Sequence, residues 1–266
     1  MSSASGSALS ARHHDAPLYR LGCAGVTDTG RLRDHNEDRF GIFPEIGLFA
    51  VADGMGGAAA GEVAAQMAIE LICEAFVDSD VTWPLGERGP GGKGLSLLEA
   101  AIRRANHCIH GVSLTTPACR GMGTTIAAVL VRGQRAMLAH VGDSRIYRLR
   151  RRRLEAMTED HSLFNELVRA GIADPEHPEN FAQHNLIMRA LGPEPTVEVD
   201  ARMVEVVPGD TFLLCSDGLC GVVTQPEITA ILLHHTNLDE AAEQLITSAN
   251  AEGGPDNITA VLVRIG

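Results

Sequence analysis

Apolar residues recur every three or four positions in two long segments, 60–77 and 95–114, and this spacing predicts two long helices. The same periodicity predicts shorter helices at 161–171, 225–234 and 238–251. Four of these five helices therefore form two pairs, one in each half of the chain.

Other segments are continuously apolar or alternate in polarity, which predicts β-strands. These segments are 19–27, 38–43, 47–53, 123–131, 135–142, 145–150, 153–157, 197–206, 211–217 and 257–265. Several are joined by turns of a few residues, and such short links require antiparallel pairing. Paired helices and strands grouped in hairpins predict an α+β domain, in which helices cover antiparallel sheets.

Three segments lack periodicity. Residues 1–17 are small and polar, and we expect a disordered leader. The segment 78–94 is rich in glycine and proline, which predicts a surface loop, and 172–196 has four prolines, which predicts an irregular and mobile segment.

Composition excludes several classes of partner. The 266 residues are 45% hydrophobic and carry a net charge of −12, so a sizeable core is expected and nucleic acid is not expected as a partner. No apolar run approaches the roughly 18 residues of a membrane span, and the N-terminus lacks the apolar stretch of a signal peptide. The six cysteines form no CxxC pair and mostly lie in apolar runs. This pattern is typical of reduced, buried thiols in a cytoplasmic protein.

The stretch LFAVADGMGGAAAG at 48–61 ends an apolar strand on Asp53 and continues almost without side chains. One interpretation is a dinucleotide-binding loop, since 54–59 formally fits GxGxxA. That fingerprint requires a parallel βαβ unit, and Asp53 would repel a pyrophosphate. The other interpretation is that the strand delivers Asp53 as a metal ligand, and that the glycines keep space free beside it.

Other acidic residues also stand next to apolar segments. Asp143 and Asp217 each follow one between small residues, Asp256 precedes the last one, and Glu37 and Asp38 precede an earlier one. Taken singly, each is an ordinary turn residue. If two sheets pack face to face, however, several strand ends can converge at one edge. Carboxylates gathered there would repel one another unless cations lay between them.

Carboxylate and carbonyl oxygens are hard ligands, so the expected cation is Mg²⁺ or Mn²⁺. Zinc is not favoured, because the chain has no HExxH motif and no Cys/His pair at finger spacing, and its eleven histidines are scattered. We expect most of those histidines to be surface or structural residues. Two carboxylate-bridged cations can acidify a bridging water and stabilise an in-line displacement at phosphorus. Arg33, four residues before Glu37, can hold the phosphate.

With these residues assembled, the chain resembles the metal-dependent protein phosphatases of type 2C, the PPM family of serine/threonine phosphatases, in its bacterial form. The resemblance runs from about residue 20 to residue 265. The motifs, in the family's order, are RDHNEDR, FAVADGMGG with GE at 61–62, GMGTT at 121–125, HVGDSRIYRL at 140–149, TEDHS at 158–162, LLCSDGL at 213–219 and GGPDNIT at 253–259. Seven motifs in the family's order make the resemblance very specific.

The resemblance implies a four-layer α/β/β/α sandwich, with two central antiparallel sheets flanked by helix pairs. It implies a single phosphatase domain over 18–266, with a flap subdomain at about 161–192 beside the site. Flaps of this kind are candidates for substrate choice.

The resemblance also implies a set of metal ligands. Asp53 would bridge two ions, the Gly54 carbonyl and Glu37 would bind one of them, and Asp217 and Asp256 would bind the other. A third, weaker ion would lie between Asp217 and a further aspartate, Asp143.

Two more residues receive catalytic roles from the resemblance. Arg33 would grip the phosphate, and Asp38 would hold a water bound to an ion. Some relatives carry a histidine after Asp-Gly that is proposed as the general acid, but this chain has Met55 there, and a thioether cannot donate a proton. The sequence leaves the general acid open. The arginine run at 148–153 stands where relatives show a short turn. Such a run can dock acidic phosphosites or a partner, but the favoured expectation is a solvated hairpin tip.

The activity implied is hydrolysis of phosphoserine and phosphothreonine in proteins, with two to three Mn²⁺ or Mg²⁺ ions and direct attack of activated water on phosphorus. The implied partners are phosphorylated proteins, in particular a cognate serine/threonine kinase and its substrates, and we expect a cytoplasmic monomer. Two alternatives stay open: a catalytically inactive relative that acts as a binding or regulatory module, and a phosphatase for small phosphate esters. Intact Asp53, Asp217 and Asp256 argue against the inactive relative.

Overall fold

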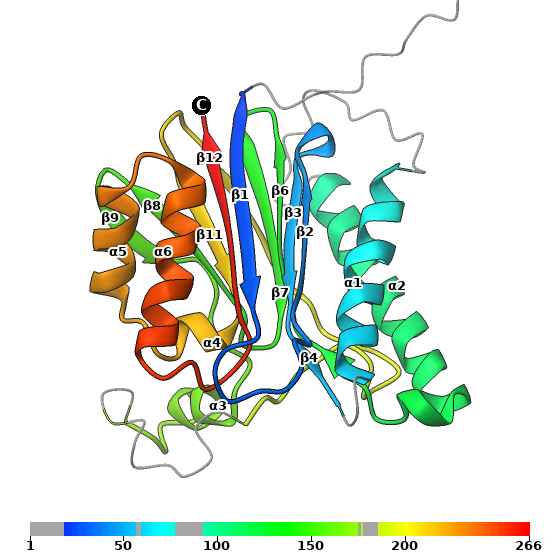
Figure 1. The fold of residues 1–266 in the computed structure, drawn as a ribbon. Coiled ribbons are helices and arrows are strands. Elements are labelled where there is room, and N and C mark those ends of the chain that lie inside the picture. The colour runs from blue at the N-terminus through cyan, green and yellow to red at the C-terminus, as the bar shows by residue number, and fades with distance from the viewer. Residues whose placement is uncertain (1–18, 57–59, 78–92, 175–176, 178–185) are drawn as a thin grey trace, which may run out of the picture.

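The computed structural model describes the chain except for residues 1–18, 57–59, 78–92, 175–176 and 178–185. The expected leader, almost all of the expected 78–94 loop and much of 172–196 lie outside the described residues. The described residues form two five-stranded antiparallel sheets that face each other, with helices on both outer faces (Figure 1). The predicted four-layer α/β/β/α sandwich is confirmed.

The first sheet joins the N-terminal strand to the C-terminal half of the chain. Its order is β1 (Leu21–Asp28), β12 (Ile258–Ile265), β11 (Thr211–Cys215), β8 (Arg145–Arg150) and β9 (Arg153–Ala156). The second sheet has the order β10 (Asp200–Glu205), β7 (Arg135–Val141), β6 (Ile126–Arg132), β3 (Leu48–Ala52) and β2 (Arg39–Phe43). A small two-stranded ladder, β4 (Gly54–Met55) with β5 (Gly123–Thr124), extends the β3 end of the second sheet.

The helices cover the two sheets in pairs, as expected. The second sheet is covered by α1 (Ala60–Val77) and α2 (Lys93–Thr115), and the first sheet by α5 (Gln225–His234) and α6 (Leu238–Ala251) (Figure 1). The helix α3 (Leu163–Arg169) lies at the end of the sandwich, within the expected flap segment. None of the helices in the described part of the chain is long and apolar enough to cross a bilayer.

Both faces of the sheets are covered, which explains why the strands read as continuous apolar runs. In β3, Phe49 and Val51 belong to the core between the two sheets. Leu48 and Ala50 point the other way and pack with α1 and α2, for example with Ile72. A third cluster lies between the first sheet and the helices α4 to α6.

Two local predictions need correction. The strand expected at 211–217 ends at Cys215, and a one-turn helix, α4 (Asp217–Cys220), follows. A single helical turn is too short to show periodicity. The strand expected at 197–206 begins at Asp200, close to where its partner β7 ends at Val141, and residues before Val199 lie beyond the end of β7.

The cysteines are all unpaired, as expected. Their expected burial is right for Cys215, which has no exposed surface. The other five are only half-buried.

Candidate metal and phosphate site

The second sheet brings three of the expected carboxylates to one end of the sandwich. Arg39, the first residue of β2, pairs with Ala52, the last residue of β3. Glu37 and Asp38 immediately precede β2, and Asp53 immediately follows β3. Antiparallel pairing therefore places all three at the same sheet end.

The first sheet contributes the remaining acidic residues from the same end. Cys215, the last residue of β11, pairs with Ala260 near the start of β12. Asp217 follows β11 and Asp256 precedes β12, so the two lie close to each other. Asp143 comes from the turn after β7.

The aspartates interact with one another. Burial raises the pKa of Asp53 well above its ordinary value, and the charges on Asp38, Asp217, Asp143 and Asp256 raise this pKa further. Burial followed by the charge on Asp256 raises the pKa of Asp217. The structure thus brings the five aspartates into one electrostatic cluster. Their roles as ligands stay a prediction.

Backbone and hydroxyl groups fix Asp53 in place. Its amide donates a hydrogen bond to the Thr125 hydroxyl at 3.0 Å, and its carbonyl accepts from the Thr125 amide at 2.9 Å. The Thr124 hydroxyl donates to the same carbonyl at 2.9 Å. The GMGTT motif therefore anchors the end of β3.

Asp38 lies behind the cluster and is completely buried. The hydroxyls of Ser216 and Thr259 each donate a hydrogen bond of 2.6 Å to its Oδ2. Its Oδ1 has no hydrogen-bond partner. Burial raises the pKa of Asp38 to about 6, although the two hydroxyl bonds act in the opposite direction.

Asp143 and Asp217 line a cavity of about 530 Å³ that opens beside α3 and α4. Each has a buried Oδ1 without a hydrogen-bond partner. Burial, followed by the charges on Asp217 and Asp160, raises the pKa of Asp143 to about 7. Arg145 and Asp160 also line this cavity, and Arg145 holds Asp160 with two hydrogen bonds of 2.9 and 2.7 Å.

The glycines after Asp53 have a steric reason that the sequence did not show. A Cβ on Gly54 would lie 2.2 Å from the carbonyl oxygen of Gly61 and 2.7 Å from that of Glu37. A Cβ on Gly61 would lie 2.7 Å from the Gly54 carbonyl carbon. Gly54 therefore keeps room for two other backbone segments. The Glu37 amide is held by the Asn257 side chain at 2.8 Å.

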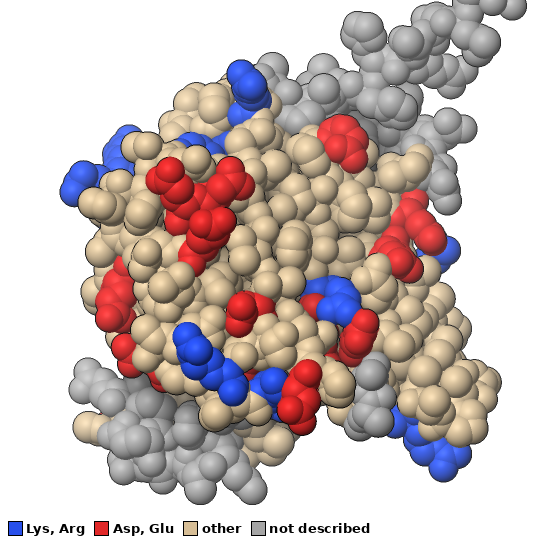
Figure 2. All heavy atoms as spheres, viewed as in Figure 1, with Lys and Arg blue, Asp and Glu red and all other residues tan. Residues whose placement is uncertain are grey.

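Arg33 reaches the cluster from the loop before β2. Its Nη2 donates a hydrogen bond of 2.6 Å to Oδ2 of Asp256, and 54% of its side chain is exposed. The hydrogen bond to Asp256 raises the pKa of Arg33, and the charges on Asp256, Asp217 and Asp53 raise this pKa further. On the face shown in Figure 2, basic and acidic side chains lie side by side toward the lower end of the sandwich.

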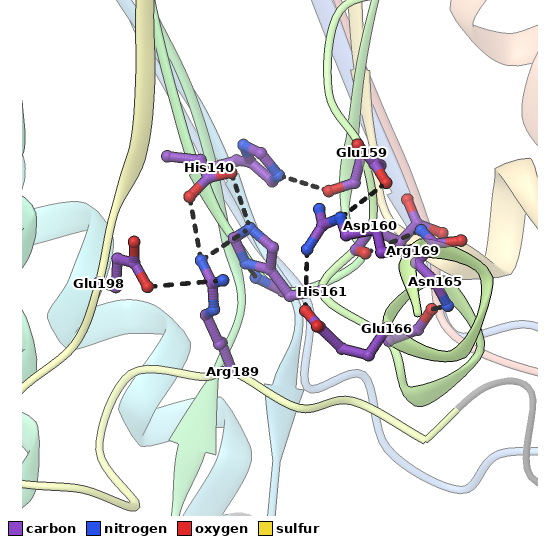
Figure 3. Close-up of polar contacts among 12 residues, drawn as sticks. His140, Glu159, Asp160, His161, Asn165, Glu166, Arg169, Arg189 and Glu198 are labelled. Carbon is purple, nitrogen blue, oxygen red and sulfur yellow. Dashed lines mark hydrogen bonds and ion pairs between the residues drawn. The ribbon is translucent and has the colours of Figure 1, made fainter. Parts of the chain in front are cut away.

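Sequence reasoning missed the polar residues that hold these carboxylates. Ser216, Thr259 and Asn257 lie in the recognised motifs, but nothing in their spacing shows what they contact. It also missed a second polar cluster, in which the stacked imidazoles of His140 and His161 lie near Asp200 (Figure 3). Both histidines are buried, so the expectation of structural histidines holds for this pair.

Residues 31–262 match the family described as Protein phosphatase 2C. The chain belongs to this family. The serine/threonine phosphatase stp of Listeria monocytogenes is 41% identical over 240 residues, which cover 89% of this chain and 93% of the relative. The serine/threonine protein phosphatase PstP of Mycobacterium tuberculosis is 41% identical over 243 residues, which cover 91% of this chain and 44% of the relative.

Solved structures of the protein phosphatase 2C family share this fold. The crystal structure of M. tuberculosis PstP superposes with a TM-score of 0.82 at 40% identity, covering 92% of this chain and 98% of the other. A structure of the PstP catalytic domain in complex with two manganese ions gives a TM-score of 0.79 at 39% identity, with the same coverage. The expected family and the expected class of enzyme, a metal-dependent protein phosphatase, are confirmed. The inactive alternative receives no support.

Proposed function

We propose that this chain hydrolyses phosphoserine and phosphothreonine side chains of proteins in the acidic pocket at the end of the sandwich. The observation that carries the proposal is the convergence of five aspartates from distant parts of the chain, with an arginine at their edge. The names of the relatives, which are serine/threonine phosphatases, support the same substrate class.

The pocket fits divalent cations. Asp38, Asp143 and Asp217 each keep one buried carboxylate oxygen without a hydrogen-bond partner, which is costly unless a cation or water occupies the space. Carboxylate oxygens favour Mn²⁺ or Mg²⁺ over zinc, and the two manganese ions of the PstP structure agree with this cofactor. Such ions, when bound, lower the pKa of water and neutralise charge on a phosphoryl group.

We assign the ligands as follows. Asp53 lies among the other aspartates and would be shared between two ions. Glu37 and the Gly54 carbonyl would help to hold one ion, and Asp217 and Asp256 would help to hold the other. We further propose that Asp143 and Asp217 hold a third, weaker ion at the wall of the cavity.

The remaining groups act on substrate and water. Arg33 is exposed and anchored beside Asp256, so its guanidinium can bind the phosphate oxygens of an incoming substrate. Asp38 is fixed by two hydroxyls, and its free Oδ1 can accept a hydrogen bond from water. Met55 cannot protonate the leaving alkoxide.

We propose that the substrates are products of a cognate serine/threonine kinase, because phosphoserine and phosphothreonine are formed by that class of reaction. The six unpaired thiols support a reducing compartment such as the cytoplasm. We also propose that the chain is a single-domain monomer with a flap at 161–192.

The test is hydrolysis of a phosphothreonine peptide with manganese, with magnesium and with a chelator. We expect turnover with either ion and none with the chelator. The Asp217→Asn variant should be inactive and should bind fewer Mn²⁺ ions, whereas Asp34→Asn, at an exposed carboxylate of the Arg33 loop, should behave as wild type. Turnover that persists in chelator, or full activity of Asp217→Asn, would refute the proposal.

A further inference from the structure

The second polar cluster joins four segments of the chain beside the Asp143 turn. His140 comes from β7, His161 precedes α3, Asp200 begins β10, and Arg189 closes the flap segment (Figure 3). The two imidazole rings stack with centroids 4.5 Å apart and an interplanar angle of 23°. Only 1% of His161 is exposed, so its ring nitrogens must find partners within the protein.

The hydrogen bonds of His161 assign its tautomer. The amide of Gly142 donates to Nδ1 of His161 at 3.1 Å, so Nδ1 carries no proton. Nε2 therefore carries the proton and faces Oδ2 of Asp200 at 3.3 Å. Arg189 holds the other oxygen of Asp200 at 3.0 Å, which fixes the acceptor in place.

His161 grips Gly142 through two hydrogen bonds. Besides the bond to Nδ1, the His161 amide donates to the Gly142 carbonyl at 3.0 Å. Gly142 has φ +104°, in the region that favours glycine, and a Cβ there would lie 2.6 Å from Thr125. The next residue is Asp143, whose buried Oδ1 has no partner.

The residue after Asp143 is also held in place by a hydrogen bond. The hydroxyl of Ser144 lies 2.7 Å from that of Thr125, and Thr125 in turn binds the backbone of Asp53. The two attachments fix Asp143 from both neighbours, relative to Asp53.

A metal ion in the histidine cluster itself is not favoured. His140, His161 and Asp200 each offer a ligand atom within 4.8 Å of the others, which is close enough for an ion. However, Nδ1 of His161 already accepts a hydrogen bond, so an ion at Nε2 would require an imidazolate. Arg189 also lies 3.3 Å from Nε2 and supplies the positive charge there.

We propose that His161 is a positioning residue for Asp143: through Gly142 it sets the direction of the Asp143 carboxylate, and Asp200 holds the tautomer that this requires. The inference rests on the ligand role proposed above for Asp143. Groups that orient metal ligands from outside typically change metal affinity by about 10–100-fold when they are removed.

Two substitutions of His161 separate the hydrogen bond from packing. In His161→Asn, Oδ1 stands near the position of Nδ1 and can accept from Gly142, but the ring stacking is lost. In His161→Phe the ring stays and the acceptor is lost. Both variants should be less stable than wild type, so stability does not distinguish them, whereas Mn²⁺ affinity does.

The experiment titrates the metal-free full-length chain with Mn²⁺ and follows free Mn²⁺ by electron paramagnetic resonance. We expect His161→Phe to lower the affinity for the most weakly bound Mn²⁺ ion by about tenfold or more. His161→Asn should change this affinity by less than about threefold, and the affinities for the more tightly bound ions should not change in either variant. Wild-type affinity in His161→Phe, or equal losses in both variants, would overturn the proposal.

Two further measurements test the role of His161 separately from the folding of its variants and from the ligand role of Asp143. Nitrogen NMR of the wild-type imidazoles should show His161 neutral and unprotonated at Nδ1, and a proton on Nδ1 would overturn the proposal even if the variants do not fold. Asp143→Asn should lose the same weak ion. If it does and His161→Phe does not, the positioning role alone fails; if it does not, the ligand role of Asp143 fails as well.

Discussion

Arg33 donates a hydrogen bond of 2.6 Å to Asp256, so the cation proposed to hold phosphate contacts a carboxylate proposed to hold metal. The pair is partly exposed, with 54% of the arginine and 33% of the aspartate side chain accessible. Exposed pairs of this kind are worth at most about 1 kcal/mol. A phosphate dianion can therefore compete for the guanidinium without a large loss of stability.

Arg33→Ala is expected to raise KM for a phosphopeptide by about 10- to 100-fold, because a charge-assisted contact to phosphate of roughly 1.5–3 kcal/mol is removed. The value of kcat should change little, and so should the melting temperature. Arg31→Ala is the matched control, since the Arg31 side chain binds the Asn250 carbonyl instead. Steady-state kinetics at saturating manganese check this prediction. A large loss of kcat at unchanged KM would show that the main role of Arg33 is not to bind the substrate phosphate.

Asp53→Asn is expected to separate stability from activity. In chelator the variant should melt at a higher temperature than wild type, because a buried charge that neighbouring carboxylates repel is gone. With manganese its kcat should fall by about a thousandfold, which corresponds to several kcal/mol of transition-state stabilisation. Thermal melts in chelator and in manganese, together with peptide hydrolysis, measure both effects. A chelator melt below that of wild type would contradict the repulsion argument.

The long helices and the end-of-strand aspartates could be predicted because each leaves a local signal. The periodicity of 60–77 matches the helix α1, Ala60–Val77, at both ends. Asp53 and Asp217 follow apolar strands whose antiparallel partners return to the same edge, so their approach follows from the fold class alone.

The hydrogen bonds that orient the site could not be predicted in the same way. Ser216 and Thr259 meet at Asp38 because of the register between β11 and β12. Both strands are buried on both faces, so no alternation of polarity along them indicates that register. Likewise His140 and His161 stack because the end of β7 contacts the residues that precede α3. A contact between residues from three or four segments becomes visible once the sheets are assembled.

Gly54→Ala is expected to destabilise the chain by about 3 kcal/mol, because a Cβ would meet the backbone of Gly61 at 2.2 Å and backbone atoms cannot move aside. Gly111→Ala is the control. Gly111 lies in α2 with nothing within 4 Å of the added Cβ, so alanine should stabilise by about 0.5–1 kcal/mol. Chemical denaturation of both variants in chelator gives the comparison. If Gly54→Ala were as stable as Gly111→Ala, the contact between Gly54 and the Gly61 backbone would not be tight.

The hairpin between β8 and β9 offers a test of the arginine run. Arg151 and Arg152 have φ 50° and 66°, a turn for which Asn-Gly is preferred. The double variant Arg151→Asn/Arg152→Gly should therefore gain about 1 kcal/mol of stability and keep the KM of a short phosphopeptide. Arg150→Asn is the contrast, because Arg150 binds the buried Asp210 at 2.6 and 2.5 Å, and its loss should destabilise by about 2–3 kcal/mol. A raised peptide KM in the double variant would mean that the tip takes part in binding substrate.

His161 should make stability depend on pH in a defined direction. Burial, followed by repulsion from His140 when that ring is protonated and by the charge on Arg189, lowers the pKa of His161 to about 4, against the opposing effect of Asp200. An unfolded histidine takes up a proton below pH of about 6.5, whereas folded His161 does so only near its lowered pKa. The stability that His161 contributes is therefore present above about pH 6.5 and is lost as the pH falls toward 4, by on the order of 3 kcal/mol.

His161→Asn removes this titration and keeps the acceptor for Gly142. The difference in unfolding free energy between wild type and variant should consequently shrink as the pH is lowered from 7 to 4.5. Urea denaturation of both proteins in chelator at several pH values measures that difference, in which the titration of the shared aspartates cancels to first order. A constant difference across this range would mean that His161 titrates alike in the folded and unfolded chain, and its buried neutral tautomer would then be wrong.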